Sequence, residues 1–182
     1  MKVHARTCFR RTLRADGSLP TVPTWQTEKS GAYHLPVERL YAEMVPFGTR
    51  FQNIVSPVWM RPEGAWAVVS GGMRGADIRS PRLGSPFPLD AALHAACAWA
   101  QRYVGVVAFP VAMQQRVIRQ QTRPGQKYNA CAGFREENGA GLIFDLWLHD
   151  REGRLCEFIR GLTMRDVSGG RLRPPAWVRD GK

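Results

Sequence analysis

The sequence predicts an α+β domain in which one antiparallel sheet wraps around a buried helix. Residues 89–103 contain six alanines and show no clear polar face, which is typical of a helix buried on most sides. After Gly105, apolar and polar residues alternate over four long segments, and this is the period of β-strands. Turn residues such as Pro124-Gly125 separate these segments, so neighbouring strands are expected to run antiparallel.

The other elements are predicted from similar local patterns. Residues 36–44 begin with Pro36 and carry apolar side chains at helical spacing, which predicts a short amphipathic helix. Residues 51–60 and 65–70 are expected to form strands joined by a tight turn. After the central helix, strands are expected at residues 106–119, 126–135, 142–149 and 155–165.

We divide the chain into three parts. Residues 1–31 are expected to hold a short N-terminal strand and a linker rich in Pro, Thr and Ser. Residues 32–167 form the predicted domain, and residues 168–182 are expected to be a flexible tail because they contain Gly-Gly and Pro-Pro pairs.

The chain has 182 residues and a formal net charge of +11. Arginine supplies most of the excess, and such a surface predicts an anionic partner: nucleic acid, acidic lipid headgroups or an acidic protein. The arginines are scattered through predicted strands and loops, and no nucleic-acid-binding motif accompanies them. We therefore interpret them mainly as a solvated basic face, and most of the six tryptophans as core residues rather than base-stacking ones.

The four cysteines indicate the compartment. They are widely spaced, with no CxxC pair and no histidine at the spacing of zinc ligands. No stretch resembles a signal peptide or approaches the ~20 apolar residues that span a membrane. We therefore expect a cytoplasmic protein with reduced thiols, no metal site and no membrane contact.

Three segments, in order, resemble one known family. Residues 85–94, Ser-Pro-Phe-Pro-Leu-Asp-Ala-Ala-Leu-His, resemble the start of the central helix in the second, C-terminal hotdog of polyketide synthase dehydratase domains. Residues 47–52, Phe-Gly-Thr-Arg-Phe-Gln, are similar to the family pattern Tyr-Gly-Pro-x-Phe-Gln, and residues 150–165 resemble its closing strands. The resemblance covers residues 35–167. It implies a hotdog fold, which is a sheet curled around a central helix.

Asp90 is the residue on which the chemistry depends. It lies in the first turn of the predicted central helix, where free N–H groups favour its ionised form, whereas burial would raise its pKa. If desolvation prevails, the carboxyl can stay protonated and deliver a proton to a departing hydroxyl. His94 lies four residues on, so it can orient Asp90. The alternative is that Asp90 only caps the helix.

The resemblance also implies roles for other residues. It makes Asp90 and His94 the catalytic residues. The sequence departs from the family pattern at Thr49, Ser85 and Pro88, and these differences indicate an altered pocket. The residues implied to bind substrate are Phe47, Gly48, Phe51, Pro86 and Leu89.

The family's second catalytic group is a histidine in the pattern His-x-x-x-Gly-x-x-x-x-Pro. None of His4, His34, His94 and His149 stands in this pattern. Residues 3–5, Val-His-Ala, resemble the last strand of the first hotdog, so we expect the chain to begin there and to carry the second hotdog complete. The missing histidine would then come from a hotdog partner, either a second copy or a separate chain.

The predicted function is a dehydratase-like protein that acts on or binds a β-hydroxyacyl thioester. The family implies that an acyl carrier protein presents this substrate on phosphopantetheine, within polyketide or fatty-acid assembly and without another cofactor. One alternative is a non-catalytic subunit that binds acyl chains or the carrier protein. Another is a basic nucleic-acid-binding protein, whose affinity would fall steeply with salt.

Overall fold

The computed structural model describes residues 21–27, 29–72 and 83–180. The predicted N-terminal strand and residues 3–5 lie outside these described residues. Seven strands form one sheet in the order β1-β2-β3-β5-β6-β7-β4, and every neighbouring pair is antiparallel. The strands are β1 Tyr33–Leu35, β2 Val58–Arg61, β3 Gly64–Ser70, β4 Phe109–Ile118, β5 Lys127–Asn138, β6 Gly141–His149 and β7 Leu155–Arg165.

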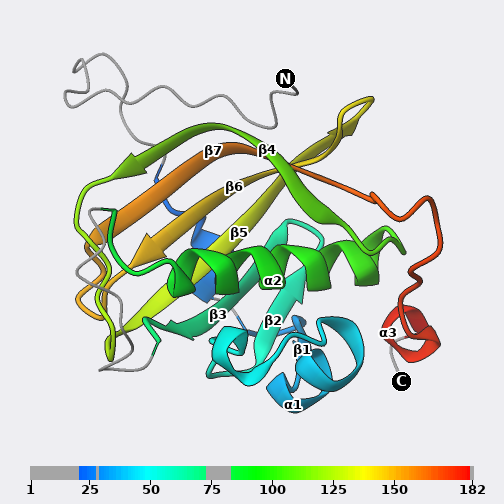
Figure 1. The fold of residues 1–182 in the computed structure, drawn as a ribbon, viewed down its shortest axis with the longest axis horizontal. Coiled ribbons are helices and arrows are strands. Elements are labelled where there is room, and N and C mark those ends of the chain that lie inside the picture. Colours follow the sequence, from blue (N-terminus) through cyan, green and yellow to red (C-terminus); the bar gives the residue numbers. More distant parts are fainter. Residues whose placement is uncertain (1–20, 28, 73–82, 181–182) are drawn as a thin grey trace, which may run out of the picture.

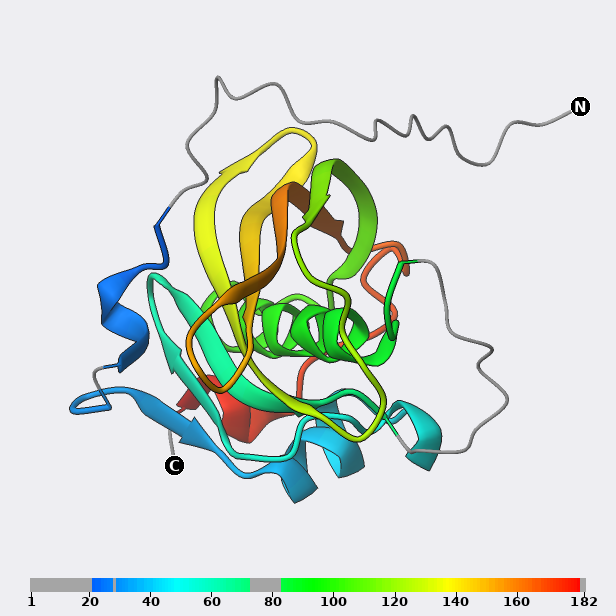
Figure 2. The same cartoon turned by 90° about the vertical axis from the view of Figure 1, so that its left-hand side faces the viewer.

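The sheet curls around helix α2, Phe87–Tyr103, as predicted (Figures 1 and 2). The helix packs most of its surface against the sheet, and all six of its alanines are at most 1% exposed. Small side chains let the curved strands approach the helix closely. The four leucine and phenylalanine side chains on the inner face of β6 are buried in the same core: Leu142, Phe144, Leu146 and Leu148.

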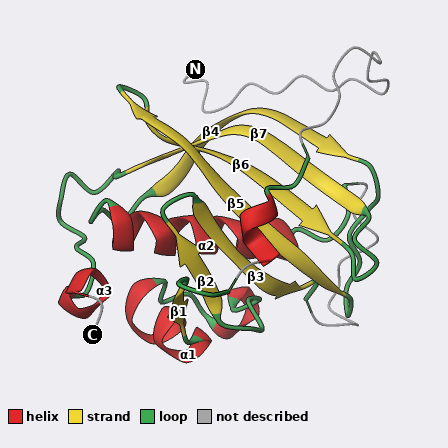
Figure 3. Ribbon diagram, turned by 180° about the vertical axis from the view of Figure 1, so that it is seen from behind, coloured by secondary structure: helices red, strands yellow, loops and turns green. Residues whose placement is uncertain are grey.

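The outer face of the sheet is covered in part by residues preceding β1. Trp147 of β6 and Phe158 of β7 form a second buried cluster, against which Trp25 packs. Trp25 belongs to the short helix η1, Thr24–Thr27, which lies across the sheet on the side away from α2 (Figure 3). The predicted alternation is correct, but the polar side of β6 is buried as well: Trp25 packs against Trp147, and Asp145 accepts the Gly161 N–H at 2.8 Å.

The region between residues 36 and 57 differs from the prediction. The expected helix at 36–44 is present as α1, Val37–Arg39, continued by one π-helical turn, η2, Leu40–Met44. The expected strand at 51–60 is shorter and begins only at Val58. Before it, η3, Thr49–Phe51, is a 3-10 turn, and the Asn53 side chain donates a hydrogen bond to the carbonyl of Arg50 at 2.8 Å. Strand pairing here is reduced to one bridge, Ile54 with Val69 of β3.

The C-terminal residues contain a helix that the sequence pattern did not reveal. Helix α3, Ala176–Asp180, lies beside α2, and Val178 is fully buried. Trp177 donates to a carboxylate oxygen of Glu43 at 2.5 Å, and the Arg39 guanidinium lies 3.5 Å from the centre of the Trp177 ring. The central helix also begins two residues before its predicted start, since proline is tolerated in a first helical turn.

Candidate active site

The start of helix α2 is tied to two neighbouring loops. The Ser85 hydroxyl donates to the carbonyl of Gly71 at 2.7 Å. The Ser85 N–H donates to the carbonyl of Thr122, and the Thr122 hydroxyl donates back to the carbonyl of Ser85, both at 2.8 Å. The serine that departs from the family pattern thus fixes the position from which the helix projects Asp90.

Asp90 does not cap this helix. Its N–H already bonds to the carbonyl of Pro86, and no side-chain hydrogen bond caps the helix start. Its Oδ2 atom is buried without a hydrogen-bond partner among the described residues. Burial raises the pKa of Asp90, which favours the protonated carboxyl. The cap interpretation therefore does not explain this carboxyl.

His94 faces Asp90 from the next turn of the helix. The distance from its Nε2 to Oδ2 of Asp90 is 3.4 Å, which is long for a completed hydrogen bond. Burial lowers the pKa of His94 to about 4, so the imidazole is neutral at neutral pH. A neutral histidine supplies no positive charge to hold the carboxylate ionised. The pair is therefore a carboxyl of raised pKa beside a neutral imidazole.

Two aromatic side chains hold the His94 ring. The Phe47 ring stacks on it with centroids 4.9 Å apart, and the Tyr41 ring meets it edge-on at 5.8 Å. The Tyr41 oxygen lies 3.5 Å from Nδ1 of His94 and accepts the Ile54 N–H at 2.9 Å. Sequence reasoning gave Tyr41 no site role, because its helical spacing marked it only as a packing residue. The feature that could have indicated a role for Tyr41 is a hydroxyl group at a position predicted to lie in the core.

The structure brings together some of the residues expected to bind substrate. Phe47 and Phe51 are about half exposed, and the Phe51 ring meets Phe87 of the first helical turn edge-on at 6.2 Å. Gly48 and Pro86 are exposed as well. Leu89, in contrast, packs against the core. The arrangement is an apolar surface next to Asp90.

A cleft of about 420 Å³ is lined in part by Tyr41. Its lining residues are Val37, Glu38, Tyr41, Ala42, Gln52 and Ile54. Asp90 is not among them, and its side chain is 35% exposed. The described part of the chain therefore leaves one side of Asp90 open.

A buried ion pair supports the same region from the sheet. Glu157 of β7 is fully buried, and two nitrogens of Arg116 approach its Oε2 at 2.7 and 2.9 Å. The Thr122 hydroxyl lies 3.4 Å from the other carboxylate oxygen. Because Thr122 also bonds to Ser85, this pair connects the sheet to the start of α2. Arg116, which the sequence placed on a solvated basic face, is thus a structural residue.

The other described histidines lie elsewhere. His34 packs against the Trp59 ring, and His149 lies on the outer face of β6, where burial lowers its pKa. Neither contacts Asp90 within residues 21–27, 29–72 and 83–180, and His4 is outside them. In the same ranges, no group of three metal-ligating side chains comes together. The described helices also include none with the length and apolar character needed to cross a membrane.

An antiparallel sheet curled around one helix defines a hotdog domain, and an aspartate in the first turn of that helix lies beside an apolar surface. The family model described as "Polyketide synthase dehydratase N-terminal domain" matches residues 21–174, so the chain belongs to the polyketide synthase dehydratase family. Because this model describes an N-terminal domain, the assignment of the chain to the second hotdog stays a prediction. Comparison with curated proteins gave no match.

Several solved structures share the fold. The dehydratase domain from the CurK module of curacin polyketide synthase is 19% identical, with a TM-score of 0.63 over 81% of this chain and 53% of that one. The bifunctional dehydratase-cyclase domain in ambruticin biosynthesis is 22% identical, with a TM-score of 0.60 over 82% of this chain and 54% of that one. The dehydratase domain of RzxB from Pseudomonas fluorescens is 18% identical, with a TM-score of 0.59 over 76% of this chain and 51% of that one. The chain thus spans about half the length of these structures.

Proposed function

We propose that this protein is a dehydratase-type hotdog subunit that acts on a β-hydroxyacyl thioester, with Asp90 as the proton donor. The observation that carries the proposal is the carboxyl of Asp90, whose pKa is raised by burial and which faces a neutral histidine rather than a cation. A carboxyl that retains its proton can protonate a leaving hydroxyl. Phe47 and Phe51 supply an apolar surface on which an acyl chain can lie.

The reaction needs two groups at separate positions. A base removes the proton from the α-carbon, the Cα–Cβ double bond forms, and the Cβ–O bond breaks. The departing hydroxyl takes the proton of Asp90 and leaves as water, so that Asp90 ends as a carboxylate and the base ends protonated. Exchange of both groups with solvent restores the starting state. His94 is neutral and faces Asp90, so we assign it the orientation of the acid rather than the role of base.

We further propose that the base comes from a partner hotdog domain. Among related structures, two forms of the CurK dehydratase are inactive mutants, one with a histidine replaced by phenylalanine and one with an aspartate replaced by asparagine. The described part of this chain offers Asp90 but no second histidine beside it. The chain also spans about half of the matched structures. A second domain would supply the missing half and close the open side of Asp90.

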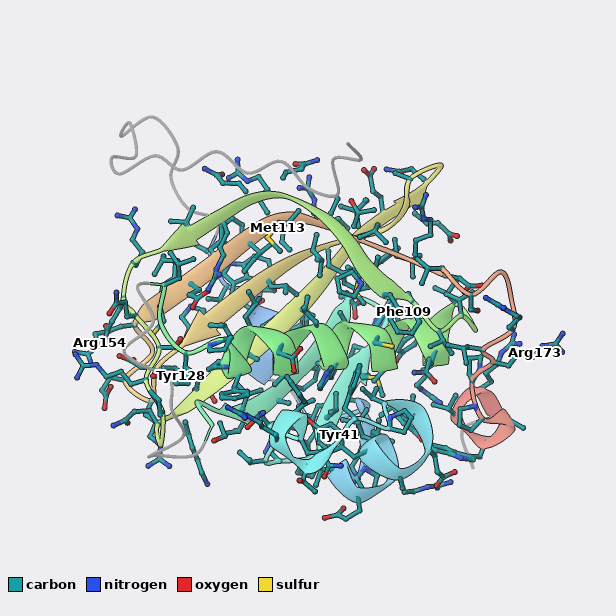
Figure 4. All side chains as sticks on the ribbon, viewed as in Figure 1. Tyr41, Phe109, Met113, Tyr128, Arg154 and Arg173 are labelled. Carbon is teal, nitrogen blue, oxygen red and sulfur yellow. The ribbon has the colours of Figure 1, made fainter. Side chains whose placement is uncertain are left out.

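Strand β4 is the place where such a partner can pair. It lies at one edge of the sheet, next to β7 only. Val111 and Met113 are 40% and 44% exposed on this edge strand, and Figure 4 labels Met113 on it. Apolar residues on a long, exposed edge strand are a ready template for pairing with another sheet.

We also propose that the substrate arrives on an acyl carrier protein within a larger polyketide synthase. Arg50, exposed in the same short turn as Phe51, is a basic side chain that can meet the phosphate of a phosphopantetheine arm. No further cofactor is needed, because the reaction transfers only protons and releases water. We place the protein in the cytoplasm, where the buried Cys97, Cys131 and Cys156 remain free thiols.

One observation favours a second candidate, a non-catalytic subunit that binds acyl chains or the carrier protein. Within the described residues, no base stands opposite Asp90, and one carboxyl alone cannot act as acid and base at two positions. On this alternative, Asp90→Asn leaves acyl binding and biological output unchanged.

The experiment supplies a β-hydroxyacyl pantetheine thioester to the full chain, alone and mixed with a hotdog domain that carries the histidine motif. The conjugated enoyl thioester is followed by absorbance and mass spectrometry. We expect product only in the mixture, and none when Asp90→Asn replaces the wild type. Glu137→Gln, at an exposed position of the β5–β6 hairpin, is the matched control and should retain activity. Binding of the thioester without product in any mixture would instead support the non-catalytic subunit.

A further inference from the structure

We propose that Tyr41 is a positioning residue: its hydroxyl holds the neutral His94 in the tautomer whose Nε2–H faces Asp90. The inference rests on the proposed function, since it assigns a role at the same site. It uses a residue from η2, outside the helix that carries Asp90. Figure 4 shows Tyr41 between α2 and the short helical segment below it.

The direction of the Tyr41 proton follows from the groups around its oxygen, which are the backbone N–H groups of Ile54 and Asn53 and the His94 ring. The Tyr41 oxygen accepts the Ile54 N–H at 2.9 Å, so its single proton is free to point elsewhere. Nδ1 of His94 lies 3.5 Å from this oxygen. Burial raises the pKa of Tyr41 to about 12, so the hydroxyl keeps its proton at neutral pH. The hydroxyl is therefore a donor toward His94.

A neutral imidazole carries one N–H and accepts at its other nitrogen. If Nδ1 accepts the proton of Tyr41, the N–H must be on Nε2. This nitrogen is the one that lies 3.4 Å from Oδ2 of Asp90. Hydrogen bonds of catalytic groups are often long in the free protein and shorten when substrate binds. The Nε2–H is thus aimed at the carboxyl before the contact is complete.

When Asp90 is protonated, this tautomer determines which of its two oxygens carries the proton. Oδ2 is buried, whereas the side chain as a whole is 35% exposed, so Oδ1 is the oxygen open to substrate. Because the Nε2–H group is itself a donor, it disfavours a proton on the Oδ2 atom that it faces. The proton of Asp90 is then on Oδ1. In the opposite tautomer, the Nε2 lone pair would attract a proton to Oδ2, where no substrate can take it.

The packing keeps the imidazole in place. Phe47 stacks on one face with an interplanar angle of 15°, and Tyr41 meets the ring at 83°. The titratable groups that face the His94 ring are Tyr41 from η2 and Asp90 from α2. In the described part of the chain, no basic side chain forms an ion pair with Asp90. The orientation of this acid therefore depends on neutral groups alone.

The test measures the ring-nitrogen NMR shifts of His94, which distinguish the two tautomers, in the full chain and in Tyr41→Phe. We expect the Nε2–H form in the wild type. In the variant, the ratio of the Nε2–H to the Nδ1–H form should fall about fivefold, the factor that one ordinary hydrogen bond supplies. The matched control is Tyr128→Phe, because the buried Tyr128 hydroxyl also accepts a backbone N–H, from Arg123 at 2.7 Å. It should lower stability without moving the His94 shifts.

A second measurement follows the pKa of Asp90 by carboxyl-carbon NMR. Tyr41→Phe should raise this pKa further, because the donor that stabilises the carboxylate is partly lost. The same substitution made in a His94→Leu background should leave the pKa of Asp90 unchanged. A wild-type His94 in the Nδ1–H form, or shifts that Tyr41→Phe does not move, would overturn the inference. Neither measurement needs substrate, so failure of the dehydratase proposal would show separately as absence of enoyl product.

Discussion

Replacing Arg116 by leucine tests whether the buried ion pair supports the site. Glu157 is fully buried, and the variant leaves its carboxylate with only the Thr122 hydroxyl at 3.4 Å. Removing one partner of a buried pair costs about 3–5 kcal/mol. Because Arg116 is itself 24% exposed, we expect the lower end of this range, about 3 kcal/mol at neutral to alkaline pH.

The loss should depend on pH in a defined direction. Burial raises the pKa of Glu157 above its usual 4.5, although Arg116 lowers it, and in the variant the pKa rises further. The native state then holds the proton more tightly than the unfolded state does. Stability is therefore greatest below the unfolded-state pKa and is lost as pH rises through the folded-state pKa. We expect a loss of about 3 kcal/mol at about pH 8, but only about 1 kcal/mol at about pH 4, where the carboxyl is mostly protonated in both the folded and the unfolded state.

Denaturant unfolding followed by circular dichroism at the two pH values measures both quantities. The double variant Arg116→Leu with Glu157→Leu should recover most of the stability, because an apolar pair replaces the charges. Arg151→Leu is the control, since this arginine is exposed in the turn between β6 and β7 and forms no ion pair within the described residues, and it should change stability little at either pH. An equal loss at both pH values would refute the reasoning.

Three further predictions concern the site and its partner. Asp90→Asn should melt higher than the wild type in alkaline buffer and equally in acid, because a carboxyl of raised pKa loses native stability as it ionises; thermal melts across pH measure this. Gly72→Ala should cost about 1–3 kcal/mol in denaturant unfolding, because φ is +84° and its Cβ would lie 2.2 Å from the Phe87 ring. Lysine at Val111 and Met113 should prevent association with the partner hotdog in sedimentation without lowering the melting temperature.

The central helix and the long strands could be predicted because their patterns are local. The six alanines of α2 are buried where the sequence placed them, and β6 and β7 lie within one residue of their expected ranges. The strand predicted at residues 51–60 is continuous only from Val58; before it, pairing with β3 is limited to the bridge at Ile54. The bond of the Asn53 side chain to the Arg50 carbonyl and Pro57, which lacks an N–H, both favour an irregular segment over a continuous strand.

The candidate site shows the same division. Asp90 and His94 could be paired from their spacing, since residues four apart share a helix face. Tyr41 could not, because 53 residues separate it from His94 and only the folded chain brings them together. The role of Arg116 was hidden for the same reason: its partner Glu157 lies on another strand. Polar contacts between residues far apart in the chain produce no periodic pattern in the sequence, so they cannot be predicted from it.

The acid and its missing base are linked by burial as well as by chemistry. Asp90 remains 35% exposed in this chain, so solvent still stabilises its charged form. A partner that covers the open side would remove that water and raise the pKa of Asp90 further. The same contact would bring the histidine that removes the α-proton. We therefore expect that the acid reaches its working protonation state only in the assembled pair, and that carboxyl-carbon NMR will show the pKa of Asp90 rising when the partner binds, before any substrate is added.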